Sequence, residues 1–304
     1  MTSSRVVGAR VRARQETVRA ITDAARVQLG EVGAAALSVR AVTRALGMSA
    51  SSVYRYFPNR DALLTALILD AYRGVGEAAA RAESAVDRAD LLGRWLAVHR
   101  AVRAWALDHP HEYALIYGSP VPGYVAPEDT TVPAAQVVLL LAAVAVESWV
   151  VRGQSAGPSG GDDARIGSHG APSAGSTGAS DGGSVDGVLA EVPGGTPLTE
   201  ALRADLRARL DQALAGLPED LRPEPSAIDP HLVLAVVDAW TELFGSISFE
   251  LFGHFRNVVD ARGDHVDATA RRTAAAAGIV ARPAAITTTV AATATAERAA
   301  RDCT

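Results

Sequence analysis

Three helix starts follow one another within residues 37–64, and no other part of the chain constrains the fold as strongly. Ser38 suits the N-cap of a first short helix, which Gly47 ends with a sharp turn. Ser49 caps a second helix, and Asn59 caps a third after an intervening proline. The inward residues recur at helical spacing: Val39, Val42 and Leu46 in the first helix, and Ala50, Val53 and Phe57 in the second. These residues are therefore predicted to form a compact helical unit with very short connections.

Two short helices joined by a glycine turn are the pattern of a helix-turn-helix, whose second helix enters the major groove of DNA. Small residues at its start let the backbone approach the base edges, while arginine and tyrosine reach bases and phosphates. Helix geometry turns outward Ser51, Ser52 and Arg55, with Tyr54 and Tyr56 on the flanks. The alternative interpretation is an ordinary helical core with two surface tyrosines. It leaves the Tyr-Arg-Tyr sequence without a purpose, so we favour DNA binding.

The same unit closely resembles the DNA-binding domain of the TetR family of transcriptional regulators. The resemblance covers residues 14–72 and consists of a glycine, small residues, a Tyr-x-Tyr-Phe motif and a basic residue before an Ala-Leu-Leu run. The matching positions are Gly47, Ser49, Ser51, Ser52, Val53, Tyr54, Tyr56, Phe57, Arg60, Ala62, Leu63 and Leu64.

The resemblance and the helix geometry together assign a role to each polar side chain of this unit. The residues expected to face bases are Arg40, Ser51, Ser52, Tyr54 and Arg55. Those expected to hold phosphates are Ser38, Tyr56 and Arg60, and Ser49 completes the predicted DNA-binding set. The partner implied is a double-stranded DNA operator.

The distribution of charge agrees with a polyanionic partner for one end of the chain. Residues 1–60 hold ten arginines against Glu16, Asp23 and Glu31, a balance of +7 in a chain whose net charge is -5. The rest of the chain therefore carries -12. All 29 basic residues are arginine. This excludes mechanisms that require lysine, such as Schiff bases, Walker loops and Ser-x-x-Lys nucleophiles.

The amino-acid composition limits which fold classes and which cellular compartments are compatible with the chain. An alanine-rich, phenylalanine-poor chain of 304 residues is predicted to be all-α and to form two modest domains. The single cysteine, Cys303, has no partner within the chain, which fits a reducing cytoplasm. The N-terminus lacks an apolar signal core, and the longest apolar run, 137–146, is about half of what a bilayer requires. We expect a soluble, cytoplasmic protein without a membrane partner.

The residue pattern also predicts the organisation of the chain. Residues 1–13 are expected to be a flexible basic arm, and 14–73 the helix-turn-helix domain. A larger helical domain spans 74–278, and a flexible tail follows at 279–304. Glycine, serine, alanine and aspartate dominate 153–195, which is predicted to be a disordered insert. The remaining predicted helices are 14–29, 60–85, 91–107, 111–117, 134–152, 198–214, 230–251 and 264–277, with a loop at 118–133.

The larger domain resembles the WHG type of TetR C-terminal domain. Its Trp-x-x-Leu-His-Gly signature reads Trp240, Leu243, Phe244 and Gly245 here, so that phenylalanine replaces histidine. A His-Pro-x-x-Tyr stretch is also present: His109, Pro110 and Tyr113. The resemblance implies a domain that senses a ligand and forms a homodimer.

Two sets of side chains are expected to serve these functions. A cavity for a small apolar or aromatic effector is predicted along Trp95, His99, Trp105, Tyr113, Tyr117 and Trp149, which could equally be ordinary core residues. The predicted dimer interface consists of Leu202, Leu206, Leu210, Trp240, Phe244 and Ile247.

Two short motifs resemble parts of catalytic or metal sites, but neither has the surrounding structure that such a site requires. Residues 157–161 match the nucleophile-elbow pattern but lack the strand and helix that an elbow requires. His109, His111 and Glu112 could be imagined as metal ligands, yet beside a helix start such residues cap the helix or line a pocket. The sequence therefore predicts no enzyme, no metal site and no cofactor.

The predicted function is a DNA-binding transcriptional regulator. We expect a repressor that binds a palindromic operator as a dimer and is released by a small-molecule effector. The alternative is a non-catalytic helical interaction protein that uses its basic end for another partner. Salt-dependent, sequence-selective DNA binding would distinguish the first from the second.

Overall fold

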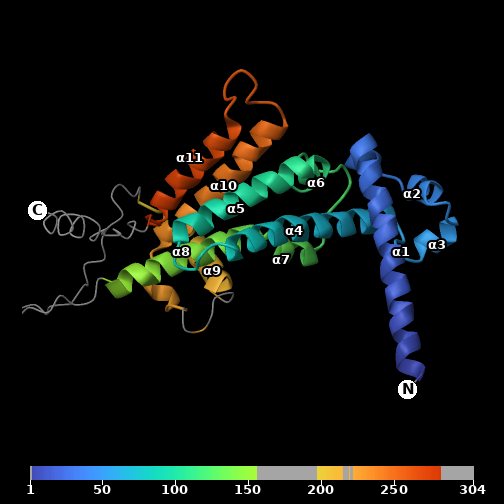
Figure 1. The fold of residues 1–304 in the computed structure, drawn as a ribbon, viewed down its shortest axis with the longest axis horizontal. Helices are drawn as coiled ribbons and strands as arrows, with labels where there is room; N and C mark the ends of the chain where they lie inside the picture. The colour runs from blue at the N-terminus through green and yellow to red at the C-terminus, as the bar shows by residue number, and fades with distance from the viewer. Residues whose placement is uncertain (1, 156–196, 215–218, 220–221, 282–304) are drawn as a thin grey trace, which may run out of the picture.

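The computed structural model describes residues 2–155, 197–214, 219 and 222–281 (Figure 1). Its helices are α1 (Thr2–Val32), η1 (Ala34–Ala36), α2 (Val39–Ala45), α3 (Ala50–Tyr54), α4 (Arg60–Ser84), α5 (Leu91–Asp108), α6 (Pro110–Tyr117), η2 (Glu128–Thr130), α7 (Thr131–Ala134), α8 (Gln136–Ser155), α9 (Glu200–Leu214), η4 (Pro225–Ala227), α10 (Pro230–Leu251) and α11 (Arg262–Ala276). The described residues contain no strand, which confirms the all-α prediction. Of the predicted insert 153–195 and tail 279–304, only 153–155 and 279–281 lie within the described residues.

The first three helices and the start of α4 surround the smaller of two apolar cores. Ile21 of α1, Val53 of α3 and Leu63 of α4 are fully buried in it. Asn59 caps α4 as predicted, because its side-chain oxygen accepts a hydrogen bond from the backbone N–H of Ala62 at 2.7 Å. Helices as short as α2 and α3 are unstable alone, so this shared core holds them in place.

α4 continues out of this unit and runs along α5 into the larger domain (Figure 1). There α5, α8, α10 and α11 pack around a second core that includes the fully buried Trp95 and Ile247. Tyr113 ties α6 to α10, since its hydroxyl donates to the carbonyl oxygen of Phe244 at 2.8 Å and lies 2.8 Å from Ser248 Oγ. One long helix thus connects the basic end of the chain to the second core.

A buried ion-pair network joins α4, α5 and α8. Arg94 is 1% exposed, and its Nε donates to Glu83 Oε1 at 2.6 Å. Its second guanidinium nitrogen donates to Glu147 Oε2 at 2.9 Å, and Arg88 pairs with the same glutamate at 2.8 Å. Two carboxylates face two guanidinium groups, so the network balances its own charge, as a buried ion pair must.

The structure corrects several predicted boundaries. α1 begins at Thr2, so the predicted flexible arm 1–13 is helical from its second residue. No proline interrupts it, and arginine is a good helix former. α3 ends at Tyr54 rather than next to Pro58, and the N–H groups of Tyr56 and Phe57 both donate to the carbonyl oxygen of Val53, at 2.9 Å and 3.0 Å. The predicted loop 118–133 contains η2 and the start of α7, since proline is tolerated in a first helical turn.

Two core helices are long and apolar enough to cross a bilayer. Mean hydropathy reaches 1.6 over Gln136–Gly153 of α8 and 1.5 over Pro230–Leu251 of α10. Both helices were predicted, at 134–152 and 230–251, but only the uninterrupted apolar run 137–146 was compared with the thickness of a bilayer. The two helices pack against each other, and 44% and 33% of these spans are buried within the described protein. Much of each apolar helix is therefore left only partly covered.

Candidate nucleic-acid interface

The connection between α2 and α3 has the geometry of a helix-turn-helix. Gly47 has a φ of 61°, a left-handed conformation that glycine adopts without strain. Its N–H donates to the carbonyl oxygen of Arg44 at 3.1 Å, which closes the end of α2. Ser49 caps α3 as predicted, since its Oγ accepts a hydrogen bond from the N–H of Ser52 at 3.3 Å. These bonds fix how the second helix leaves the first.

The side of α2 and α3 turned away from the core is polar and basic. The exposed members of the predicted base-facing set are Arg40, Ser51, Tyr54 and Arg55. Ser52 is half-buried, and its Oγ lies 2.7 Å from Ser49 Oγ. The two serines that start the recognition helix thus bond to each other, while the arginines and Tyr54 remain available to a ligand.

A hollow of about 460 Å³ opens between the start of α2 and the end of α3. Its lining includes Ser38, Arg40, Tyr54 and Arg60, which the sequence placed in the DNA-binding set. Ser38 stands at the N-cap of α2, but its side chain makes no capping hydrogen bond. The structure therefore brings four predicted residues into one concave surface at a helix start, a shape suited to a phosphate group.

Tyr56 lies between two arginines, Arg14 of α1 and Arg55. The guanidinium carbon of Arg14 lies 5.1 Å from the centre of its ring, and that of Arg55 lies 5.3 Å away. The hydrogen bond from Arg55, followed by one with Thr17, lowers the pKa of the Tyr56 hydroxyl. Two cations beside a tyrosine hydroxyl form a positive patch that attracts a phosphate.

Arg60 departs from its predicted role of holding a phosphate. Its Nε donates to the carbonyl oxygen of Leu37 at 3.2 Å, and a second nitrogen donates to Ala34 at 2.8 Å and Ala35 at 3.1 Å. Its side chain is 30% exposed. Arg60 therefore holds the η1 segment against the start of α4, and most of its donors are already occupied.

Two arginines that the prediction left out also belong to this surface. Arg44 is exposed on α2, one helical turn after Arg40. The four-residue spacing of this pair is visible in the sequence. Arg14 belongs to α1 and reaches Tyr56 only because of the way α1 crosses the unit, which no local pattern reveals.

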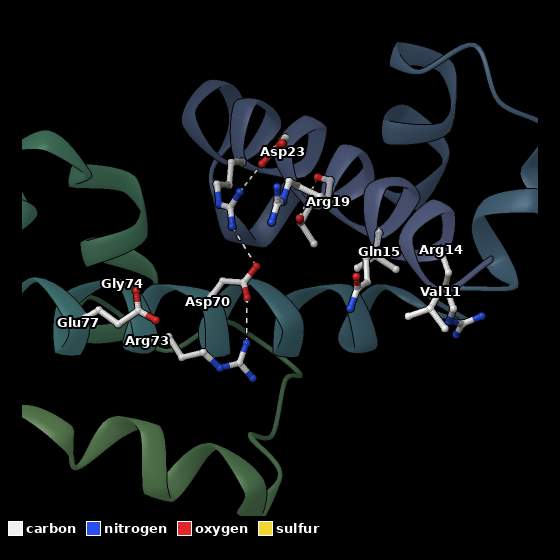
Figure 2. Close-up of a pocket in the computed structure, with 12 residues that line it drawn as sticks. Val11, Arg14, Gln15, Arg19, Asp23, Asp70, Arg73, Gly74 and Glu77 are labelled. Carbon is white, nitrogen blue, oxygen red and sulfur yellow. Dashed lines mark hydrogen bonds and ion pairs between the residues drawn. The ribbon is translucent and has the colours of Figure 1, made fainter. Parts of the chain in front are cut away.

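A groove of about 670 Å³ lies between α1 and α4, beside the junction of the two domains (Figure 2). Arg26 of α1 pairs with Asp23 of its own helix, with Asp70 of α4 at 2.9 Å and with Glu112 of α6 at 3.2 Å. Asp70 also accepts a hydrogen bond from Arg73 at 3.1 Å. One arginine of the DNA-binding unit is thus linked to the connecting helix α4 and to α6 of the larger domain.

The six residues predicted to line an effector cavity do not gather around one space. Trp95, His99 and Tyr113 are fully buried core residues. Trp95 Nε1 donates to Thr273 Oγ1 at 3.3 Å, and His99 Nδ1 lies 2.9 Å from the carbonyl oxygen of Trp95. Burial lowers the pKa of His99 to about 4 and raises the pKa of Tyr113 to about 12. Periodicity placed these three residues in the core correctly.

The other three predicted cavity residues are spread over the domain. Trp105 stacks on His109 with ring centres 5.0 Å apart, and Trp149 packs on the edge of the core. Tyr117 lies 4.0 Å from Phe244, centre to centre, and burial raises its pKa. It also lines a hollow of about 720 Å³ between α1, α6 and α10.

The predicted dimer interface is corrected by the burial of its members within one chain. The exposed fractions of four of them are small: Leu206 5%, Leu210 3%, Phe244 7% and Ile247 0%. Leu202 is 39% exposed and Trp240 is half-buried. The first four are covered by their own chain, so they are not available to a second copy. Apolar periodicity identified a buried face but not what covers it.

Helix-turn-helix units with exposed arginines and a tyrosine on the second helix are those of DNA-binding regulators, and fold and surface place this chain in that class. Comparison with family models agrees. Residues 21–67 match the bacterial regulatory proteins of the tetR family, and residues 95–277 match the tetracyclin repressor-like C-terminal domain. The chain belongs to the TetR family of transcriptional regulators.

Relatives carry the same description. HTH-type transcriptional regulator Mb1846 of Mycobacterium bovis is 46% identical over 125 residues, which are 41% of this chain and 53% of that protein. HTH-type transcriptional regulator Rv1816 of Mycobacterium tuberculosis matches with the same identity and coverage. The chain thus spans about half the length of these relatives. A solved structure of a protein described as regulatory, SCO4313, is 29% identical with a TM-score of 0.55, covering 86% of this chain and 97% of its own.

Proposed function

We propose that this regulator is a cytoplasmic, non-catalytic repressor that binds a short palindromic operator as a homodimer and releases it when a small apolar or aromatic effector binds. The observation that carries the DNA-binding part is the exposed set of Arg40, Tyr54 and Arg55 beside the hollow at the start of α2. Exposed arginines read guanine in the major groove and hold phosphates beside it.

The dimer is proposed to form through α10 and α11 instead of the six residues named from the sequence. A stripe at helical spacing on α10 faces outward: Glu242, Gly245, Ser246 and Phe249. Phe249 is 52% exposed, and Gly245 has no heavy atom within 4 Å of the place where a Cβ would stand. A small residue in an open, partly apolar stripe lets a second copy approach closely. A two-fold axis then pairs the same stripe from both copies.

Release by an effector is supported by the junction of the two domains. Arg26 connects α1 to α4 and α6 through ion pairs, and α4 begins directly after the recognition helix. A shift of α4 or α6 therefore changes the support of α1. A difference in effector affinity between two arrangements, worth about 1 to 3 kcal/mol, changes operator occupancy several-fold or more.

The test is binding of the purified full chain to DNA that flanks its own gene, followed over a range of salt concentrations. We expect a sequence-selective complex whose affinity falls steeply with salt. Arg40→Ala with Arg55→Ala should abolish the selectivity, whereas Arg207→Ala, which changes an exposed arginine on α9, should not. Binding that ignores sequence would instead support the interaction protein that uses its basic end for another polyanion.

A further inference from the structure

The N-terminal turns of α1 are not covered by the rest of the protein. Among the side chains that the structure describes, Ile21 is the first of α1 to be fully buried, and every residue from Arg10 to Glu16 is exposed. A helix makes one turn in about 3.6 residues, so these exposed residues lie on all sides of it. Figure 1 shows this part of α1 extending past α2 and α3 and away from the larger domain. It is therefore a helical segment without a packed face.

The charged residues of this uncovered segment are positive up to its last residue. Four arginines precede the first acidic residue, Glu16: Arg5, Arg10, Arg12 and Arg14. Among the described residues, Arg10, Arg12 and Arg14 form no ion pair. The N-terminal end of a helix carries a partial positive charge, so cations there destabilise it, and a helix without packing is marginal in water. A negatively charged partner along this segment would stabilise it in both respects.

One side of the segment continues the surface of the recognition helix. The guanidinium carbon of Arg14 lies 5.1 Å from the centre of the Tyr56 ring, and Arg55, the C-cap residue of α3, lies 5.3 Å from the same ring. Arg10 precedes Arg14 by about one helical turn, so both stand on this side of α1. Arg12 is two residues from each of them and stands on the opposite side. Cations therefore continue from α3 along one side of the uncovered turns.

Another side of α1 faces the groove with α4 and is less suited to a polyanion (Figure 2). α4 brings Asp70 and Glu77 to this groove, which Arg14 also lines. Asp70 is already paired with Arg26 at 2.9 Å and with Arg73 at 3.1 Å. Carboxylates repel phosphate groups, and the arginines paired with them have less charge to offer a ligand. The side of α1 that continues the surface of α3 is therefore the one open to a polyanion.

We propose that the N-terminal turns of α1 lie along the DNA backbone outside the half-site that α3 reads, with Arg10 and Arg14 holding phosphates. The inference rests on the proposed function in one respect, since the DNA is the operator. From Thr2 to Glu16 the helix is about 20 Å long. At about 3.4 Å per base pair it covers roughly six base pairs beyond each half-site. These contacts add affinity and lengthen the bound DNA without reading its bases.

The test measures binding of the full chain to two DNA duplexes by fluorescence anisotropy. One duplex ends where base substitutions cease to affect binding, and the other carries about one helical turn, or ten base pairs, of arbitrary sequence on each side. We expect the wild type to bind the longer duplex about tenfold more tightly, and Arg10→Ala to reduce this advantage at least about threefold. Arg10→Ala should also lower the salt slope by about 2, one for each copy. Arg12→Ala is the matched control, because it removes the same charge from the opposite side of the same turns and should keep the advantage.

The outcomes separate this contact from the proposed function. Equal affinity of the wild type for both duplexes, with selectivity for the operator intact, overturns the contact and leaves the proposed function standing. Equal losses in Arg10→Ala and Arg12→Ala also overturn it, because they would report net charge instead of one side of a helix. Wild type that binds every sequence alike contradicts the proposed function. In that case a loss of affinity confined to Arg10→Ala still supports α1 as a surface that binds the DNA backbone.

Discussion

At the scale of single residues, arginines with the same predicted role have different surroundings. Arg40 and Arg55 are exposed, whereas Arg60 is held by three backbone carbonyl oxygens. Arg40→Ala or Arg55→Ala should cost about 1 to 3 kcal/mol of operator binding and relax the preference at one base pair. Arg60→Ala should instead lower the free energy of unfolding by about 1 to 2 kcal/mol, because it removes bonds inside the protein. Fluorescence anisotropy on a panel of operator variants and urea unfolding measure the two effects.

The result for Arg60 decides between packing and phosphate binding. If Arg60→Ala leaves the urea midpoint unchanged and weakens every DNA sequence alike, its internal bonds are of little consequence and the original phosphate role is correct. Arg44→Ala is the comparison, because its side chain is exposed. It should weaken all sequences alike without affecting unfolding.

His99 gives the protein a specific dependence of stability on pH. Burial lowers its pKa from 6.5 to about 4 in the folded protein. Between these values the unfolded chain binds a proton that the folded chain excludes, so stability falls as the pH falls through this window. The loss should reach about 3 kcal/mol near pH 4. His99→Leu should remove this part of the slope in urea unfolding measured from pH 7 to pH 4. Parallel losses in both proteins would contradict the assignment.

At the scale of helices, α4 and α8 meet at a position that permits only glycine. A Cβ on Gly76 would stand 2.0 Å from Gln136 Oε1 and 2.9 Å from Gln136 Cβ. Gly76→Ala should therefore push the helices apart and lower the free energy of unfolding by about 1 to 3 kcal/mol. Gly153→Ala in α8 meets no atom within 4 Å and should be neutral or stabilise by up to about 1 kcal/mol. Urea unfolding of both variants checks the contrast, and equal effects would contradict it.

Local chemistry explains which helices could be predicted. Ser49 and Asn59 cap helices where their side chains indicated, because a cap depends on neighbouring residues alone. Helix boundaries were predicted wrongly where the sequence signal was weak. Residues 2–13 contain neither a residue that ends a helix nor an apolar pattern that predicts one. Contacts between residues that are far apart in the sequence could not be predicted. The pairing of Arg94 with Glu83 and Glu147 links three helices, and no spacing in the sequence indicates it.

The same limit applies to the candidate site. The helix-turn-helix residues were predicted together because they are close in sequence and each has a defined place on a short helix. The hydrogen bonds of Arg60 to backbone carbonyls could not be predicted, because these partners precede it by 23 to 26 residues. A cavity between α8 and α10, lined in part by Trp240, was also not predicted, because its wall combines helices from both sides of the predicted insert, and helical periodicity does not reveal which apolar faces leave space between them.

At the scale of the whole molecule, the question is which apolar surface is covered by a second copy. Periodicity alone cannot tell a face buried by the same chain from one buried by a partner, so Leu206 and Ile247 were assigned to the interface. Ile247 is fully covered within the chain, and a charge there should unfold the domain instead of separating subunits. The stripe on α10 that contains Gly245 remains open.

The decisive variant for assembly is Gly245→Arg. It adds a long cation where the chain has open space, so the fold of each protomer should persist while a second copy can no longer approach. We expect the variant to be a monomer in sedimentation velocity. Its thermal melt should match that of the wild type at a dilution where the wild type has also dissociated. Its operator affinity should fall at least tenfold, because a palindrome is held by two linked units. Gly153→Arg is the matched control, since that glycine is also open and lies outside the stripe. It should leave the dimer intact. A Gly245→Arg protein that remains a dimer would exclude α10 as the interface, whereas a monomeric wild type at operator-binding concentrations would refute the dimer itself.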